Sequence, residues 1–211
     1  PAKELYGIKV DVPGDISSAA YFIAAALMVP GSEVLIRNVG VNPTRDGMIR
    51  VCQAMGADLT LENVRGREAE PMADLLVRHS SLKGVEIGGE IIPALIDELP
   101  MIAAMACAAQ GTTVIKDAAE LKVKESNRIR IMVENLSAMG ADIRETEDGM
   151  IIEGGRPLHG ASVDSHLDHR IAMTFAVTSL IADGVTTIKD ADCVRISYPG
   201  FYQDLSRLLE G

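Results

Sequence analysis

Two kinds of helical pattern alternate with strand patterns along the chain. Three segments are apolar on nearly every side, which is typical of helices buried inside a protein: residues 16–29, 94–109 and 171–182. Three others alternate polar and apolar residues at helical spacing, which predicts helices that cover the outside of sheets: residues 45–57, 127–141 and 201–211. Alternating runs rich in β-branched residues, such as 112–116, predict the strands.

The same order of elements occurs three times. Each copy has an apolar run, a glycine and then a strand pattern, and the glycines are Gly31, Gly111 and Gly184. A glycine at this place is typical of a left-handed helix end. The repetition predicts an α/β fold of three β-α-β-α-β-β units, each of about seventy to eighty residues, around three central helices. The third unit stops at Gly211 without closing strands, so we expect an incomplete third repeat.

Charge and cysteine content narrow the function classes. The 211 residues carry a formal net charge of −10, which argues against binding to nucleic acid or to anionic membranes. No apolar run is long enough to span a bilayer, and the N-terminus lacks a signal-peptide pattern. Cys52, Cys107 and Cys193 have neither paired nor zinc-like spacing. We therefore expect a soluble cytoplasmic protein with free thiols and no metal.

Each buried helix begins with charged or capping residues. These are Asp15, Ser17 and Ser18; Asp97 and Glu98; and Asp168, His169 and Arg170. If the helices run parallel, their N-termini share one end of the molecule, where free N–H groups favour anions. Asp97 lies inside an apolar run, and buried carboxylates are rare unless they are paired or functional. We interpret Asp97 as functional and Asp168 as an N-cap.

The stretch LKVKESNRIR, residues 121–130, places four cations around Glu125. Lys122 and Lys124 are expected on one face of a strand end, and Arg128 and Arg130 at the start of the next helix. Arginine suits carboxylate and phosphate recognition, and a glutamate among cations suits proton transfer. Two interpretations stay open for this stretch: an anion pocket that moves a proton, and a solvated corner.

Five motifs carry a resemblance to a known family. PGDISSAAYF, IDELP, LKVKESNRI, LDHRIAM and SYPGFY occur in this order. From residue 5 to 211 the sequence resembles the C-terminal portion of the 5-enolpyruvylshikimate-3-phosphate synthases, or 3-phosphoshikimate 1-carboxyvinyltransferases. The family transfers the enolpyruvyl group of phosphoenolpyruvate to the 5-hydroxyl of shikimate 3-phosphate, in the shikimate pathway of aromatic amino acid biosynthesis. The resemblance implies no metal and no organic cofactor.

The resemblance also implies an architecture. The family has two inside-out α/β barrels, each of three β-α-β-α-β-β units, and the active site lies between them. Residues 1–211 are accordingly expected to form a single domain, the C-terminal half. Its partners would be the two substrates and the N-terminal domain of the same parent chain. The first stretch of the parent chain also belongs to this domain in the family, which would account for the missing closing strands.

The resemblance assigns roles to six residues. Asp97 matches the carboxylate that accepts a proton from the sugar hydroxyl, and Glu125 matches the residue that protonates the phosphoenolpyruvate methylene. The matched substrate-binding residues are Lys124, Arg128, Arg170 and, near shikimate 3-phosphate, Glu120. A hydroxyl addition needs such a base, an acid and cationic clamps.

The sequence departs from the family pattern at two positions. Ile196 stands where the family usually has a phosphoenolpyruvate-binding lysine, and Asn127 replaces a common aspartate. Arg195 is adjacent to Ile196, but on an extended segment it would point the other way. The contacts from the other domain are also outside this chain. We therefore expect residues 1–211 alone to fold as half of a site, without measurable transfer.

Two other function classes compete with this interpretation. One is the related transferase that acts on UDP-N-acetylglucosamine, which lacks the Lys-Glu-Ser-x-Arg motif. The other is a non-catalytic domain of the same fold, which Ile196 favours. Nucleotide binding has little support, because the sequence has no glycine-rich phosphate loop.

Overall fold

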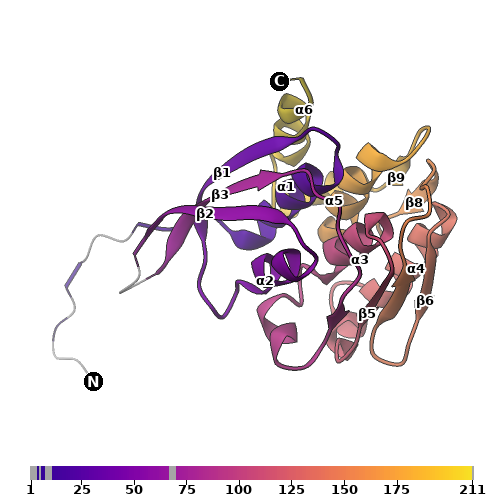
Figure 1. Ribbon diagram of the computed structural model, residues 1–211, viewed down its shortest axis with the longest axis horizontal. Helices are drawn as coiled ribbons and strands as arrows, with labels where there is room; N and C mark the ends of the chain where they lie inside the picture. Colours follow the sequence, from indigo (N-terminus) through magenta and orange to yellow (C-terminus); the bar gives the residue numbers. More distant parts are fainter. Residues whose placement is uncertain (1–3, 5, 8–10, 67–69, 211) are drawn as a thin grey trace.

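Three helices lie side by side in the middle of the molecule (Figure 1). The structure is a computed structural model, and it describes residues 4, 6–7, 11–66 and 70–210. Each central helix contacts the other two. They are α1 (Ile16–Met28), α3 (Leu99–Ala108) and α5 (His169–Thr178). Almost all of their side chains are buried, because each helix is apolar around its whole circumference.

The three sheets around these helices repeat one topology. The first has the order β1-β3-β2 with antiparallel neighbours, and Gly14 forms a parallel bridge to Val39 of β1. The second has the order β4-β5-β7-β6, in which β4 is parallel to β5 and the other pairs are antiparallel. The strands are β1 (Glu33–Gly40), β2 (Asp58–Arg65), β3 (Met72–Arg78), β4 (Glu86–Ile87), β5 (Thr112–Ile115), β6 (Asp142–Glu145) and β7 (Met150–Glu153).

The third sheet contains only the parallel pair β8 (Ser162–Asp164) and β9 (Thr187–Lys189). It corresponds to the β4–β5 pair of the second sheet. Within the described residues no antiparallel pair follows it, as the sequence predicted for an incomplete third unit.

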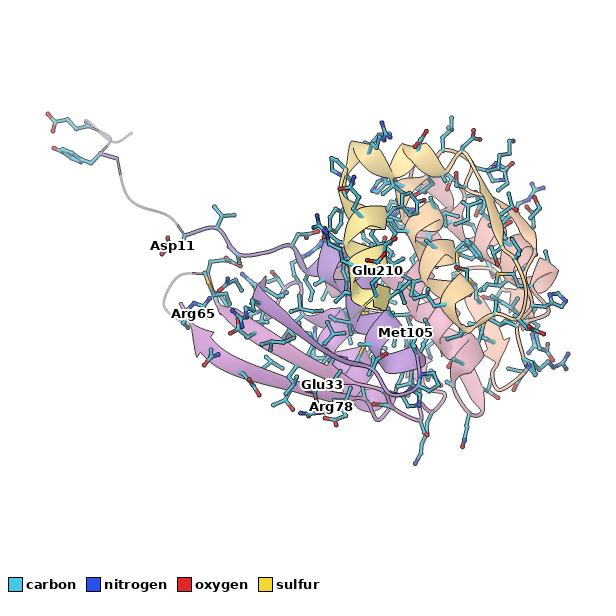
Figure 2. All side chains as sticks on the ribbon, turned by 90° about the horizontal axis from the view of Figure 1, so that it is seen from above. Asp11, Glu33, Arg65, Arg78, Met105 and Glu210 are labelled. Atoms are coloured by element: carbon cyan, nitrogen blue, oxygen red, sulfur yellow. The ribbon has the colours of Figure 1, made fainter. Side chains whose placement is uncertain are left out.

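The amphipathic helices lie on the outside, as expected. They are α2 (Gly47–Ala54), α4 (Arg128–Ala138) and α6 (Phe201–Glu210). Figure 2 shows Met105 of α3 in the middle of the fold, whereas the paired residues Glu33 and Arg78 lie on the outer side of the first sheet. Buried residues from all three units form one continuous hydrophobic core.

The left-handed conformation of the three glycines is confirmed, but they are not the helix C-caps: the C-cap residues Val29, Ala109 and Ala182 are extended, and each glycine follows two residues later in the turn. Gly31, Gly111 and Gly184 have φ of 80°, 88° and 91°, in the left-handed region that favours glycine. Each stands three residues after the end of a helical segment, at Met28, at Ala108 and at Ile181 of the 3-10 helix η3 (Ser179–Ile181).

Three local expectations were wrong. The helix predicted over 94–109 begins only at Leu99, because a 3-10 helix, η1 (Gly89–Ala94), and a turn precede it and Pro100 suits a helix start. The strand end predicted for Lys122 and Lys124 is instead the 3-10 helix η2 (Ala119–Val123), which ends just before Lys124. The segment around Arg195 is also not extended, since η4 (Ala191–Ile196) is another 3-10 helix.

Candidate functional site

The N-termini of the three central helices meet at one end of the molecule. The Ser17 hydroxyl in α1 donates a hydrogen bond to Glu98, the N-cap residue of α3. The preceding residue, Asp97, has Oδ2 3.6 Å from a guanidinium nitrogen of Arg170 in α5. Asp168 caps α5 by accepting a hydrogen bond of 3.0 Å from the Arg170 amide. The prediction that the three N-termini share one end of the molecule is therefore confirmed, and we call this end the rim.

Arg128 is the centre of this rim. It is the first residue of α4 and its side chain has no exposed surface. Its Nε lies 2.8 Å from Asp168 Oδ2, its Nη1 3.1 Å from Asp97 Oδ1 and its Nη2 2.5 Å from Glu125 Oε2. One guanidinium thus joins carboxylates from three segments that lie far apart in the sequence.

Lys124 completes the cationic side of the rim. Its Nζ lies 3.7 Å from Asp97 Oδ1 and 2.5 Å from Glu120 Oε1. All six residues that the resemblance named are therefore brought together. The cluster comprises Asp97, Glu120, Lys124, Glu125, Arg128 and Arg170, and we call it the rim cluster.

The other two cations of the LKVKESNRIR stretch do not join the rim cluster. Lys122 pairs with Glu145 at 2.9 Å, and Arg130 pairs with Glu134 one turn along α4 at 2.7 Å. Arg130 follows Arg128 by two positions, so on a helix the two side chains point to nearly opposite sides. The solvated-corner interpretation fits these two residues, whereas Lys124 and Arg128 lie inside the rim among carboxylates. The anion pocket stays a prediction.

Neighbouring cations control the ionisation of two carboxylates at the rim, Asp97 and Asp168. Burial raises the pKa of Asp97, but Arg170, Lys124 and Arg128 outweigh it and hold the pKa below its usual range. Burial likewise raises the pKa of Asp168, and the hydrogen bonds and charge of Arg128 outweigh it. Both carboxylates are therefore ionised at neutral pH, and the rim can hold anions only through its cations.

Asp168 has a second role that the sequence analysis missed. It caps α5, as predicted, but it also binds Arg128 and accepts a hydrogen bond of 2.8 Å from the Ser126 hydroxyl. The side chain is fully buried. The available signal was the charged group Asp168, His169 and Arg170 at the start of an apolar helix, and the cap alone was taken to explain the aspartate.

Of the two departures from the family pattern, Asn127 lies at the rim, next to Arg128. Asn127 caps α4 by accepting a hydrogen bond of 3.1 Å from the Arg130 amide, a task that aspartate also performs. Ile196 is 79% exposed at the end of η4. Arg195 approaches Asp192 at 3.7 Å.

The described residues contain neither a candidate metal site nor a candidate membrane-spanning helix. No three His, Cys, Asp or Glu side chains of residues 11–66 and 70–210 are grouped so that they could hold a metal ion. In the same part of the chain, no helix has both the length and the apolar character needed to cross a bilayer. The three cysteines are free and buried.

Comparisons with known proteins identify the family. The sequence profile of the EPSP synthases (3-phosphoshikimate 1-carboxyvinyltransferases) matches residues 1–205. A 3-phosphoshikimate 1-carboxyvinyltransferase of Synechococcus sp. (strain RCC307) is 54% identical over 99% of this chain and 48% of its own length. One from Thermoanaerobacter sp. (strain X514) is 59% identical over 99% of this chain and 49% of its own length. The chain thus spans about half the length of the curated relatives it matches.

Solved structures support the same conclusion. EPSP synthase from Acinetobacter baumannii aligns with a TM-score of 0.92 and 41% identity over 98% of this chain and 48% of that one. The enolpyruvyl transferase NikO from Streptomyces tendae, at 19% identity and a TM-score of 0.75 over 94% of this chain and 44% of that one, shares the fold. The predicted inside-out α/β barrel is confirmed, and the UDP-N-acetylglucosamine alternative is not favoured. The chain belongs to the EPSP synthase family, the 3-phosphoshikimate 1-carboxyvinyltransferases.

Proposed function

We propose that residues 1–211 form one domain, the C-terminal half of a cytoplasmic synthase in the shikimate pathway. The parent enzyme transfers the enolpyruvyl group of phosphoenolpyruvate to the 5-hydroxyl of shikimate 3-phosphate. The observation that carries this proposal is the rim cluster, in which two candidate proton-transfer carboxylates contact the same buried guanidinium, that of Arg128. The family membership of the chain supports the same reaction.

Asp97 is the proposed base for the sugar hydroxyl. Its three cationic neighbours keep it ionised but also weaken it as a base, because they stabilise its negative charge. Anions that bind to Arg128, Arg170 and Lys124 would share this positive charge and raise the proton affinity of Asp97. Binding of phosphoenolpyruvate would in this way prepare the carboxylate to take the 5-hydroxyl proton.

Glu125 is the proposed acid and base for the methylene carbon. Its side chain is 54% exposed and pairs with Arg128, so it has room to reach a bound substrate. As the hydroxyl oxygen adds to C2 of phosphoenolpyruvate, protonated Glu125 gives a proton to C3. As the phosphate leaves with the proton that Asp97 took from the hydroxyl, Glu125 takes a proton back from C3, and the carbon–carbon double bond forms again.

The cations of the rim are neutralised by its own carboxylates in this structure. Glu120 and Glu125 are the exposed partners, at 63% and 54%, whereas Asp168 is buried. A substrate carboxylate or phosphate can therefore replace the two exposed glutamates at Lys124 and Arg128 while Asp168 stays in place. The planar fork of each arginine suits two-point binding of such anions.

The reaction is tested by phosphate release from phosphoenolpyruvate and shikimate 3-phosphate. We expect turnover by the full-length parent chain and none by residues 1–211 alone, since the N-terminal domain supplies the other half of the site. Asp97→Asn keeps the side-chain shape and removes the base, so kcat should fall by about 10²- to 10⁴-fold. The matched control is Asp192→Asn, at a 91% exposed carboxylate outside the rim cluster.

Two results would contradict the proposal. One is steady turnover by residues 1–211 alone, which would show that no second domain is needed. The other is an Asp97→Asn enzyme whose kcat stays within a few-fold of that of the Asp192→Asn control.

A further inference from the structure

Glu98 is a buried carboxyl that directly follows Asp97 and has no part in the proposed reaction. Only 2% of the residue is exposed. Its Oε1 accepts a hydrogen bond from the Ser17 hydroxyl, and Nη2 of Arg45 lies 3.7 Å from the same oxygen. Its Oε2 is buried and has no hydrogen-bond partner among the described residues.

Core packing does not explain this carboxyl. Burial raises the pKa of Glu98, and the Ser17 hydroxyl and the Arg45 charge only partly offset that effect. A buried carboxyl with an unpartnered oxygen is less favourable than an apolar side chain of similar shape. The following positions of α3, such as Leu99 and Ile102, are apolar and fully buried. An apolar residue at position 98 would therefore suit the core better.

The contacts of Glu98 join three elements at the rim. Nη2 of Arg45 also donates a hydrogen bond of 2.8 Å to the Ser17 hydroxyl, so the three side chains form a closed cluster. Ser17 belongs to the first turn of α1, Arg45 to the turn before α2, and Glu98 to the start of α3. We call this group the anchor cluster. Two separate segments of the first unit therefore keep the Glu98 side chain pointing toward the core.

The anchor cluster determines where Asp97 can point. Successive side chains at a helical turn diverge by about 100° around the axis. With Glu98 fixed toward the core, Asp97 projects toward Arg128, Arg170 and Lys124, at 3.1, 3.6 and 3.7 Å. The amide of Glu98 also donates to the Leu95 carbonyl at 3.0 Å, which fixes the backbone of this turn.

We propose that Glu98 is a positioning residue for Asp97, held by Ser17 and Arg45 so that the Asp97 carboxylate stays against the rim arginines. The inference that Glu98 orients the Asp97 side chain depends only on the contacts described above. Its catalytic consequence rests on the proposed function.

The first test measures the Asp97 carboxyl directly. In the full-length parent chain, the pKa of Asp97 is followed by carbon-13 NMR of its carboxyl, and the signal is assigned by its absence in Asp97→Asn. We expect Glu98→Leu to raise this pKa, because a loosened Asp97 loses the arginines that lower it. Glu98→Gln keeps the side-chain shape and an oxygen that accepts the hydrogen bond from the Ser17 hydroxyl, so the pKa of Asp97 should change little in this variant. Glu134→Gln, on the exposed face of α4, is the control.

The direction of the shift separates positioning from electrostatics. Loss of a like-charged neighbour alone would lower the pKa of Asp97, and equally in Glu98→Leu and Glu98→Gln. That outcome, or no shift in either variant, would overturn the inference. If Glu98→Leu does not fold, Ser17→Ala removes the hydroxyl that holds Oε1, and the pKa of Asp97 should rise in that variant instead.

The second test measures turnover. Glu98→Leu should lower kcat by about 10- to 100-fold, since a misplaced base loses its alignment with the hydroxyl. The KM for phosphoenolpyruvate should stay nearly constant, and Glu98→Gln should restore most of kcat. A Glu98→Leu enzyme with unchanged kcat would contradict the inference. A wild-type parent chain without turnover would contradict the proposed function, while the NMR measurement would still decide the positioning role.

Discussion

Arg128→Met should be among the most destabilising single substitutions in this chain. The side chains of Arg128 and Asp168 both have no exposed surface, and the ion pair between them is 2.8 Å long. Methionine fills the volume of the arginine stem but leaves Asp168 buried with only the Ser126 hydroxyl and the Arg170 amide as donors. Removing one partner of a buried pair costs about 3–5 kcal/mol. Because the free energy of unfolding of a typical domain is about 5–15 kcal/mol, this loss is large.

The same helix provides a matched control. Arg130 is two residues further along α4, is 68% exposed, and pairs with Glu134 at 2.7 Å. Exposed pairs one helical turn apart contribute about 0.3–0.5 kcal/mol, so Arg130→Met should change stability very little. Both variants and the wild type are compared by guanidinium denaturation, followed by circular dichroism at pH 7. A loss below about 1 kcal/mol for Arg128→Met, or equal losses for the two variants, would refute the reasoning.

The pH dependence of this loss gives a sharper test. In the wild type the pKa of Asp168 is below its usual range, so its pairing stabilises the fold above the unfolded pKa of about 3.9 and is lost as pH falls through the folded pKa. Without Arg128, burial raises the folded pKa of Asp168 instead. The free energy of unfolding of the variant then falls by about 1.4 kcal/mol for each unit that the pH rises between the unfolded pKa and the raised folded pKa of Asp168. The difference from wild type should therefore be larger at pH 7 than at pH 5, and a constant difference would show that Asp168 is not the group left unpaired.

Three further predictions concern single positions. Asp15→Ala removes the acceptor for the Ser18 amide at the start of α1, and should lower the free energy of unfolding by about 1 kcal/mol in urea denaturation. Leu167→Gly should raise it by about 1 kcal/mol, because Leu167 has φ of 60° and is 66% exposed. Burial raises the pKa of the Cys52 and Cys107 thiols to about 12, so neither should react with a disulfide reagent at pH 8 until the chain is unfolded.

The central helices could be predicted because their signal is local. A helix that is apolar on all sides can only be buried, and three such helices with the same sequence context indicate a threefold arrangement. The shared rim follows once the helices are taken as parallel. The segments just before the outer helices α4 and α6 were predicted less well. At residues 119–124 and 191–196, short 3-10 turns replaced the expected extended chain, and alternation over five or six residues cannot distinguish the two.

The burial of Arg128 could not be predicted, because it depends on residues that lie far from it in the sequence, one of them in another unit. An arginine at the start of an amphipathic helix is ordinarily exposed. Its burial becomes favourable only when Asp168 arrives from the third unit and Asp97 from the second. The same holds for Glu98, whose partners Ser17 and Arg45 belong to the first unit. The rim cluster therefore needs the second and third units, and the anchor cluster beside it needs the first, so a change in the packing of the central helices should alter the ionisation of Asp97 even when no rim residue is changed.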